Sequence, residues 1–281
     1  MENNTQLKEM IRSMVIDILQ GQKQEMASSQ PIKQAPRGQV EPGVFDTVDE
    51  AIQAAKAAQA RFEDCTLATR EKVIADIRAA MRPRVQELAQ KTVDETGMGR
   101  VADKVLKLNL TLNKTPGVED LVTECETGDN GMTLYELSAY GVIGAITPST
   151  NPAETLICNS IGMLAAGNAI FFSVHPGAKN LSRELVSELN QVIAKSIGIE
   201  NLIVTLREPS IESAQEMMLH PDVSLLVVTG GPGVVKQALQ SGKKVIGAGA
   251  GNPPAFVDET ADIKKAAQDI VLGASLDNNI L

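Results

Sequence analysis

The stretch from Gly141 to Pro152 reads GVIGAITPSTNP, and the rest of the chain can be interpreted outward from it. Residues 142–147 are apolar and rich in β-branched side chains, which is typical of a strand buried on both faces. Both prolines of the PSTNP segment lack a backbone N–H and therefore predict a turn. A helical pattern follows from Ala153 to Ala166. Strand, polar turn and helix N-terminus together predict a site for an anion or a carbonyl oxygen, although most such connections only join two elements.

The same order of elements repeats along the second half of the chain, which favours a nucleotide-type site over a plain connection. Strands that alternate with helices at this spacing predict βαβ units and a largely parallel sheet. Ligands of such sheets bind at the carboxyl ends of the strands. The predicted strands are Ala169–Val174, Leu202–Leu206, Leu225–Thr229 and Lys244–Ile246, and the helical patterns between them end near Ser196, begin near Ser210 and end near Gln240.

The segment between Asp46 and Gly97 is rich in alanine and predicts helices, with a break at Pro83. A further helix is predicted from Asp103 to Lys114. Gly128 to Gly131 reads GDNG and predicts a turn, and the alternation after it predicts a strand at the edge of the sheet or in an arm.

The composition is that of a soluble globular protein of 281 residues, with 43% apolar and 22% charged residues. The net charge of −9 argues against a nucleic-acid partner, because no basic face is available to neutralise phosphates. No run of about 18 apolar residues is present, so we expect no membrane span. Three scattered cysteines show no disulfide or metal-ligand spacing, and we expect a cytoplasmic location and no metal site.

Residues 1–21 form a segment of their own, with apolar side chains on one face of a predicted amphipathic helix. Residues 22–43 are rich in Gln, Ser, Pro and Lys and predict a flexible linker. The helix either folds back onto the domain or docks on another protein, because a helix this short needs a partner for its apolar face.

Eight motifs, in order along almost the whole chain, resemble those of the CoA-acylating aldehyde dehydrogenases of bacterial microcompartments. The resemblance implies an α/β fold with a Rossmann-type cofactor-binding domain over residues 44–281, NAD as cofactor and coenzyme A as cosubstrate. It also implies conversion of a short aldehyde, such as acetaldehyde or propionaldehyde, to its acyl-CoA. The motifs are ETGMGR (95–100), TPGVEDL (115–121), TGDNG (127–131), TPSTNP (147–152), HPGAKN (175–180), TGGPGVV (229–235), GAGAGNPP (247–254) and GASLDNN (273–279).

The resemblance also assigns expected roles to individual residues. Asn151 corresponds to the asparagine whose amide stabilises the charge on the aldehyde oxygen, although an asparagine in a turn can instead bond its own backbone. A helix N-terminus behind Gly230 and Gly231 could receive a pyrophosphate. The remaining expected cofactor-binding residues are Thr147, Pro148, Ser149, Thr150, His175, Pro176, Gly177, Pro209, Val234 and Gly249.

Two comparisons with the family concern the chemistry. Ala248 lies where hydrolytic relatives carry a glutamate base, so the resemblance implies acyl transfer to CoA rather than hydrolysis. The family's nucleophilic cysteine follows the segment that ends here at Leu281, and the catalytic domain is absent from this chain. We expect Cys158 to be a packed thiol and this chain alone to be inactive. A hydrolytic aldehyde dehydrogenase is a weaker alternative.

Residues 1–21 also resemble the encapsulation peptide of microcompartment cargo, which favours docking on a shell or cargo protein over folding back. The family is oligomeric, so a homo-oligomer inside a microcompartment is the expected state of a full-length protein. The alternative function is a catalytically silent module that keeps the cofactor fold and the targeting helix.

Overall fold

The structure is a computed structural model that describes residues 41–249, 251 and 254–280. The predicted helix 1–21 and all but the last three residues of the predicted linker lie outside the described residues. Glu41, near the end of that linker, forms ion pairs with Arg183 at 3.3 Å and Arg207 at 2.7 Å. These contacts hold the last residues of the expected linker against the domain.

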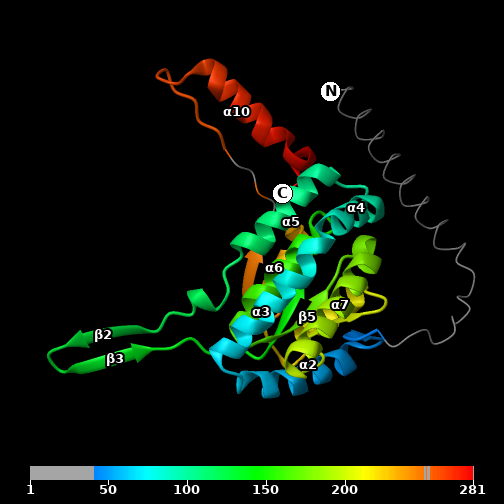
Figure 1. The fold of residues 1–281 in the computed structure, drawn as a ribbon, viewed down its shortest axis with the longest axis vertical. Coiled ribbons are helices and arrows are strands. Elements are labelled where there is room, and N and C mark those ends of the chain that lie inside the picture. Colours follow the sequence, from blue (N-terminus) through cyan, green and yellow to red (C-terminus); the bar gives the residue numbers. More distant parts are fainter. Residues whose placement is uncertain (1–40, 250, 252–253, 281) are drawn as a thin grey trace, which may run out of the picture. The chain divides into compact units, whose positions relative to one another are not determined.

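Six parallel strands form one sheet, in the order β1-β6-β5-β4-β7-β8 (Figure 1). The α/β fold with a parallel sheet that the sequence predicts is therefore confirmed. Every residue of the two central strands β4 and β5 is buried, as the apolar pattern of these segments predicts. The strands are β1 (Val44–Phe45), β4 (Val142–Ile146), β5 (Ala169–Ser173), β6 (Ile203–Leu206), β7 (Val223–Thr229) and β8 (Lys244–Ala248).

The strand order reverses at β4. The chain moves outward from β4 through β5 to β6, and then returns so that β7 pairs with the free side of β4. The loops that leave the carboxyl ends of β4 and β7 consequently diverge to opposite faces of the sheet. In sheets of this kind ligands bind in the crevice between such loops.

Helices cover both faces of the sheet. α2, α8 and α9 contact the strands from one face, and α6 and α7 contact them from the other. α3, α4 and α5 pack outside α6 and α7 (Figure 1). No helix in the described part of the chain is both long and apolar enough to cross a membrane. The helices are α2 (Val48–Glu63), α3 (Leu67–Met81), α4 (Val85–Thr96), α5 (Val101–Lys114), α6 (Pro152–Ala165), α7 (Lys179–Ile197), α8 (Ile211–Leu219), α9 (Pro232–Leu239) and α10 (Ile263–Ser275).

The break at Pro83 and the end of α4 at Gly97 follow the sequence prediction, whereas the break between α2 and α3 at residues 64–66 was not predicted. Pro83 lies in the short 3-10 turn η1 (Arg82–Arg84), which separates α3 from α4. Gly97 ends α4 in the left-handed conformation, with φ of 66°, which a residue without a Cβ adopts at little cost.

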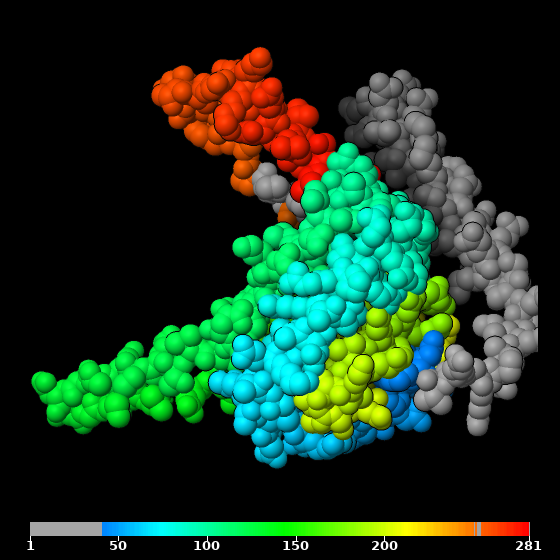
Figure 2. Space-filling view, in the orientation of Figure 1, coloured from blue at the N-terminus to red at the C-terminus, as the bar shows by residue number. Residues whose placement is uncertain are grey.

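Several elements were not predicted, among them β1, β2, α10 and η4. A strand β2 (Glu124–Gly128) pairs with β3 (Gly131–Tyr135) in a separate antiparallel hairpin, so the predicted strand lies in an arm. Figure 2 shows this hairpin, in green, uncovered on the face in view, and all its residues are exposed. α10, which buries no side chain, leads into the 3-10 turn η4 (Leu276–Asn279).

Candidate functional site

A cavity of about 500 Å³ opens at the carboxyl edge of the sheet, at the point where the strand order reverses. Its walls come from the turns after β4, β5, β7 and β8 and from the first turns of α8 and α9. The turns are far apart in sequence but adjacent here, because the strands they follow are adjacent. Of the predicted site residues, those that line the cavity are Thr147, Pro148, Ser149, Thr150, Asn151, His175, Pro176, Gly230, Gly231, Val234 and Gly249.

Gly177 and Pro209 are not among the residues that line the cavity. The backbone N–H of Gly177 instead donates to Nδ1 of His175 at 3.0 Å, which caps the short 3-10 turn η3 (Pro176–Ala178). With Nδ1 accepting, a neutral His175 ring carries its proton on Nε2. The imidazole therefore has one nitrogen committed to the turn and one available to a ligand.

Thr147 provides a polar group that the protein itself does not satisfy. Its hydroxyl is buried at the end of β4 and has no hydrogen-bond partner in the described part of the chain. Buried hydroxyl groups are usually paired, so an unpaired one in a cavity wall fits a polar ligand.

The turn after β7 fits a phosphate group. Gly231 is the N-cap of α9, Pro232 is its first residue, and no side chain caps the helix. The first N–H groups of α9 are therefore left without an intrahelical partner, at the positive end of the helix dipole. A Cβ on Gly230 would come within 3.1 Å of the Val234 side chain, so this turn is close-packed without a side chain at Gly230.

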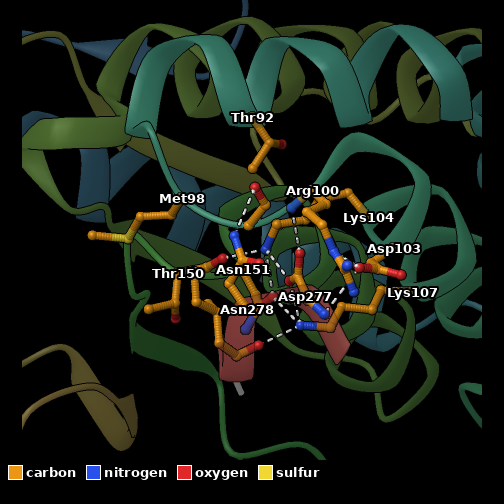
Figure 3. A network of polar contacts seen from close by, with 12 residues as sticks. Thr92, Met98, Arg100, Asp103, Lys104, Lys107, Thr150, Asn151, Asp277 and Asn278 are labelled. Carbon is orange, nitrogen blue, oxygen red and sulfur yellow. Dashed lines mark hydrogen bonds and ion pairs between the residues drawn. The ribbon is translucent and has the colours of Figure 1, made fainter. Parts of the chain in front are cut away.

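Asn151 lines the cavity and also contacts a buried cluster of charged residues, which Figure 3 shows. It is the N-cap of α6, but its side chain makes no capping bond, so the alternative in which it bonds its own turn is not what the structure shows. Its Oδ1 accepts instead from Nζ of Lys104 at 2.9 Å and from Nζ of Lys107 at 3.1 Å. Its Nδ2 donates to no described residue.

The two lysines share one carboxylate. Asp277, at the start of η4, is completely buried, and its Oδ2 lies 2.9 Å from Nζ of Lys104 and 2.6 Å from Nζ of Lys107. Its Oδ1 accepts from the backbone N–H of Arg100. Burial alone would raise the pKa of Asp277, but the hydrogen bonds from Lys107, Arg100 and Lys104 outweigh burial and lower it. Asp277 is therefore ionised at neutral pH.

Asp277, Asn278 and Asn279 all adopt left-handed backbone angles, with φ of 48°, 56° and 60°. Asn and Asp tolerate this region better than other residues with a Cβ, which accounts for the composition of the DNN sequence. The turn directs the carboxylate of Asp277 toward α5 (Figure 3).

Glu154 also lies beside this cluster. It occupies the first turn of α6, is buried, and neither of its carboxyl oxygens has a hydrogen-bond partner among the described residues. Burial raises the pKa of Glu154 against the opposing charges of Lys104 and Lys107.

The ETGMGR motif has a structural role in this arrangement. The carboxylate of Glu95 accepts from the backbone N–H groups of Asn180 and Leu181, both at 2.8 Å, at the start of α7. A Cβ on Gly99 would lie 2.2 Å from Oδ1 of Asp277, and φ at Gly99 is +79°. Only glycine fits at this position. Through Glu95 and Gly99, the loop that carries the motif contacts both α7 and η4.

Sequence reasoning missed Lys104, Lys107 and Asp277. A signal for Lys104 was present, since it lies four and eight residues before Leu108 and Leu112, which are both fully buried. A lysine on the apolar stripe of a helix is rarely buried without a partner. Its partner Asp277 is 173 residues away in the chain, and no local pattern connects the two.

The cysteines differ in part from the prediction. Cys158 is exposed on α6 and does not line the cavity, so the expectation of a packed thiol is wrong. It lies on the outward face of α6, although the residues around it in the sequence are apolar and suggest burial.

Among the described residues no group of three or more metal-binding side chains occurs. Ala248 lines the cavity, and no carboxylate does so in the described part of the chain.

Residues 18–278 match the sequence profile described as the aldehyde dehydrogenase family. The chain belongs to this family. The chain is 49% identical over 278 residues to the propanal dehydrogenase (CoA-propanoylating) of Salmonella typhimurium, across 99% of this chain and 58% of that protein. It is 50% identical to the acetaldehyde dehydrogenase (acetylating) EutE of Escherichia coli K12, across 86% of this chain and 51% of that protein. This aldehyde dehydrogenase chain thus spans little more than half the length of the relatives it matches.

Solved structures agree with this assignment. A propionaldehyde dehydrogenase from the Clostridium phytofermentans fucose utilisation bacterial microcompartment superposes with a TM-score of 0.83 at 50% identity, covering 85% of this chain and 55% of that chain. A Rhodopseudomonas palustris propionaldehyde dehydrogenase, solved with bound CoA and an acylated cysteine, gives a TM-score of 0.82 at 52% identity, covering 85% of this chain and 55% of that chain. The aldehyde dehydrogenase fold is therefore shared over most of the chain.

Proposed function

We propose that the protein containing this chain is a CoA-acylating aldehyde dehydrogenase, and that this chain supplies its cofactor site and its oxyanion donor. The observation that carries the proposal is the orientation of Asn151. Oδ1 is bonded to two ammonium groups that do not line the cavity, so the NH₂ group remains to donate to a substrate oxygen at the cavity wall.

The cofactor is NAD in this proposal, held by the cavity residues. The N–H groups at the start of α9 receive the pyrophosphate, and the hydroxyl of Thr147 and Nε2 of His175 provide polar contacts. The nicotinamide supplies the hydride acceptor. No carboxylate in the described wall would repel an additional phosphate on the ribose, and one solved relative is an engineered glycolyl-CoA reductase with bound NADP⁺. Both nucleotides therefore belong in the binding test.

The role of Asn151 follows from the two steps in which a thiolate adds to the carbonyl carbon. A cysteine thiolate from outside this chain adds to the aldehyde carbon, and the carbonyl oxygen becomes an oxyanion that accepts from Nδ2 of Asn151. Loss of hydride from the same carbon gives a thioester. Attack by the CoA thiolate regenerates an oxyanion at this position, and the cysteine thiolate leaves as acyl-CoA forms.

The final acceptor is CoA rather than water because the described cavity wall has no carboxylate base. Ala248 occupies a position at the wall where no side chain can deprotonate water, and His175 is the one titratable side chain among the described residues that line the cavity. A thioester at this site persists until a thiol reaches it.

The test uses the full-length form, which here means this chain joined to the part of its relatives' length that it does not span. We expect acyl-CoA and reduced cofactor from propionaldehyde or acetaldehyde only when CoA is present, and cofactor binding to this chain alone by calorimetry. Carboxylic acid release without CoA would support the hydrolytic alternative. Cofactor binding without any product from the full-length form would support the catalytically silent module.

We further propose that residues 1–21 dock on a shell or cargo protein of a bacterial microcompartment, and that the full-length form is a cytoplasmic homo-oligomer within it. The proposal is supported by the predicted amphipathic pattern and by the microcompartment named for one structural relative. The exposed apolar side chains of the hairpin, Met132 and Leu134, provide a surface that an oligomer would cover.

Deletion of residues 1–21 should abolish co-localisation with shells while cofactor affinity stays unchanged, because the described residues that line the cavity all lie between residues 146 and 249. Fluorescence microscopy of tagged protein in cells that produce shells measures the first, and calorimetry the second. Deletion of the hairpin tip Asp129–Asn130 is a matched control that should leave localisation intact. Normal encapsulation of the protein without residues 1–21 would remove the targeting proposal.

A further inference from the structure

Two lysines of α5 contact the amide oxygen of Asn151, and neither lysine is among the residues that line the cavity. Each ammonium group has three acceptors, which is the full number that it can satisfy. Nζ of Lys104 donates to the backbone oxygen of Thr150, to Oδ1 of Asn151 and to Oδ2 of Asp277. Nζ of Lys107 donates to the same two side-chain oxygens and to the backbone oxygen of Ile280. Neither lysine has a donor left for a ligand.

The contacts allow only one orientation of the Asn151 amide. An ammonium group donates and never accepts, so both lysines require the amide oxygen on their side. A flipped amide would place NH₂ against two cations and leave both ammonium groups one acceptor short. Because Lys104 is completely buried, water cannot replace the lost acceptor for it.

Two cations lie directly against the amide oxygen of Asn151. Lys104, Lys107 and Arg100 face this cluster together with the carboxyl groups of Asp277 and Asp103, and Asp103 is paired with Arg100 at 2.6 Å. Glu154, on α6, is buried without a hydrogen-bond partner. The ammonium groups of both lysines lie within hydrogen-bond distance of Oδ1 of Asn151. Charge at an acceptor polarises the amide and strengthens its N–H groups as donors.

We propose that Lys104 and Lys107 are positioning residues, which fix the amide of Asn151 with its NH₂ group toward the cavity and strengthen it as an oxyanion donor. The inference rests on the proposed function, in which Asn151 stabilises the oxyanion. It adds a requirement that α5, α6 and η4 be docked together, because Asp277 provides the carboxylate that both lysines share.

The first test is Lys107→Met in the full-length form, because Lys107 is partly exposed and a methionine keeps most of its apolar stem. We expect kcat to fall about tenfold, less than the loss of the oxyanion donor itself would cause, with KM for the nucleotide unchanged. Lys114→Met, on the exposed last turn of the same helix, is the matched control and should leave kcat unchanged. An unchanged kcat for Lys107→Met would overturn the proposal.

The second test distinguishes positioning from an independent effect by a double-mutant cycle. If Lys107 acts through Asn151, Lys107→Met should cause no further loss of kcat in the Asn151→Ala background. An equal loss in both backgrounds would mean that Lys107 acts elsewhere, and the proposal would be wrong.

A spectroscopic measurement on this chain needs no turnover and therefore separates this inference from the proposed function. The side-chain NH₂ resonances of Asn151 should shift in Lys107→Met and stay in place in Lys114→Met. Lys107→Gln, which keeps N–H donors without the charge, should give an intermediate shift and provides a second variant if the first does not fold. Unmoved resonances in both Lys107 variants would overturn the inference, whereas a full-length form without acyl-CoA activity would overturn the proposed function alone.

Discussion

Replacement of Asn151 by alanine should lower kcat for acyl-CoA formation by about 10²–10³-fold in the full-length form, with little change in nucleotide affinity. The amide is the side-chain donor that the structure presents at the cavity wall beside α6, and its oxygen is already bonded to Lys104 and Lys107. Steady-state kinetics with propionaldehyde and CoA measure the effect. Asn109→Ala, on the exposed face of α5, is the control and should be near wild type.

Asn151→Asp tests the N–H donor separately from stability, because it removes the donor and keeps a side chain of the same shape. A carboxylate can accept from both lysines, so the free energy of unfolding should be equal to or greater than that of the wild type. It offers no N–H to an oxyanion at neutral pH, so kcat should fall at least as far as in Asn151→Ala. A rate near wild type in either variant would show that the oxyanion donor lies elsewhere.

Replacement of Asp277 by asparagine should reduce the free energy of unfolding by about 3–5 kcal/mol, because the change leaves two largely buried ammonium groups without their carboxylate. Urea denaturation of this chain measures the loss. Asp269→Asn is the matched control, since Asp269 pairs with Lys265 on the exposed surface of α10. Exposed pairs of this kind contribute about 0–1 kcal/mol. A loss in Asp277→Asn no larger than in the control would contradict the buried-cluster interpretation.

The pH dependence of the same variant has a defined sign. The pKa of Asp277 is lower in the folded protein than its ordinary value of 3.8. Its contribution to stability is therefore complete above that ordinary value and is lost as the pH falls through the lower folded value. The pKa of Glu154 is raised in the folded protein, so the stability that Glu154 contributes is present at low pH and is lost as the pH rises through that higher value. The difference between wild type and Asp277→Asn should accordingly shrink below about pH 4.

Prediction of the fold from sequence succeeded where the pattern is local. Residues 142–147 are apolar without alternation, and this pattern follows directly from burial of β4 between two helical layers. The two prolines after it exclude a longer strand, and the repeats that follow determine a parallel α/β architecture. Most of the residues predicted to bind the cofactor line the cavity, since the loops after parallel strands meet at one edge of the sheet.

Local patterns failed where a segment has few neighbours. β2 buries no side chain, so its sequence contains little of the periodicity that burial imposes. α10 also buries none, but its apolar residues Ile263, Ala267, Ile270 and Ala274 do recur at helical spacing, so a local signal for this helix was present. Gly177 and Pro209 belong to the predicted turns but lie outside the cavity wall, because the direction in which a turn leaves its strand depends on the helix that follows. Cys158 faces outward for a similar reason, since its exposure depends on how α6 is rotated against the sheet.

The sequence by itself therefore determined the type of fold, the order of its elements and the loops that form the cavity, because burial and turn chemistry act on neighbouring residues. Only the tertiary structure decided that β7 pairs with β4 and that Lys104, Lys107 and Asp277 surround the amide of Asn151. The lysines lie on α5 and the aspartate in η4, more than 160 residues later. Charges so far apart in the chain become partners only when the packed core excludes water from both, and no stretch of either segment specifies the other.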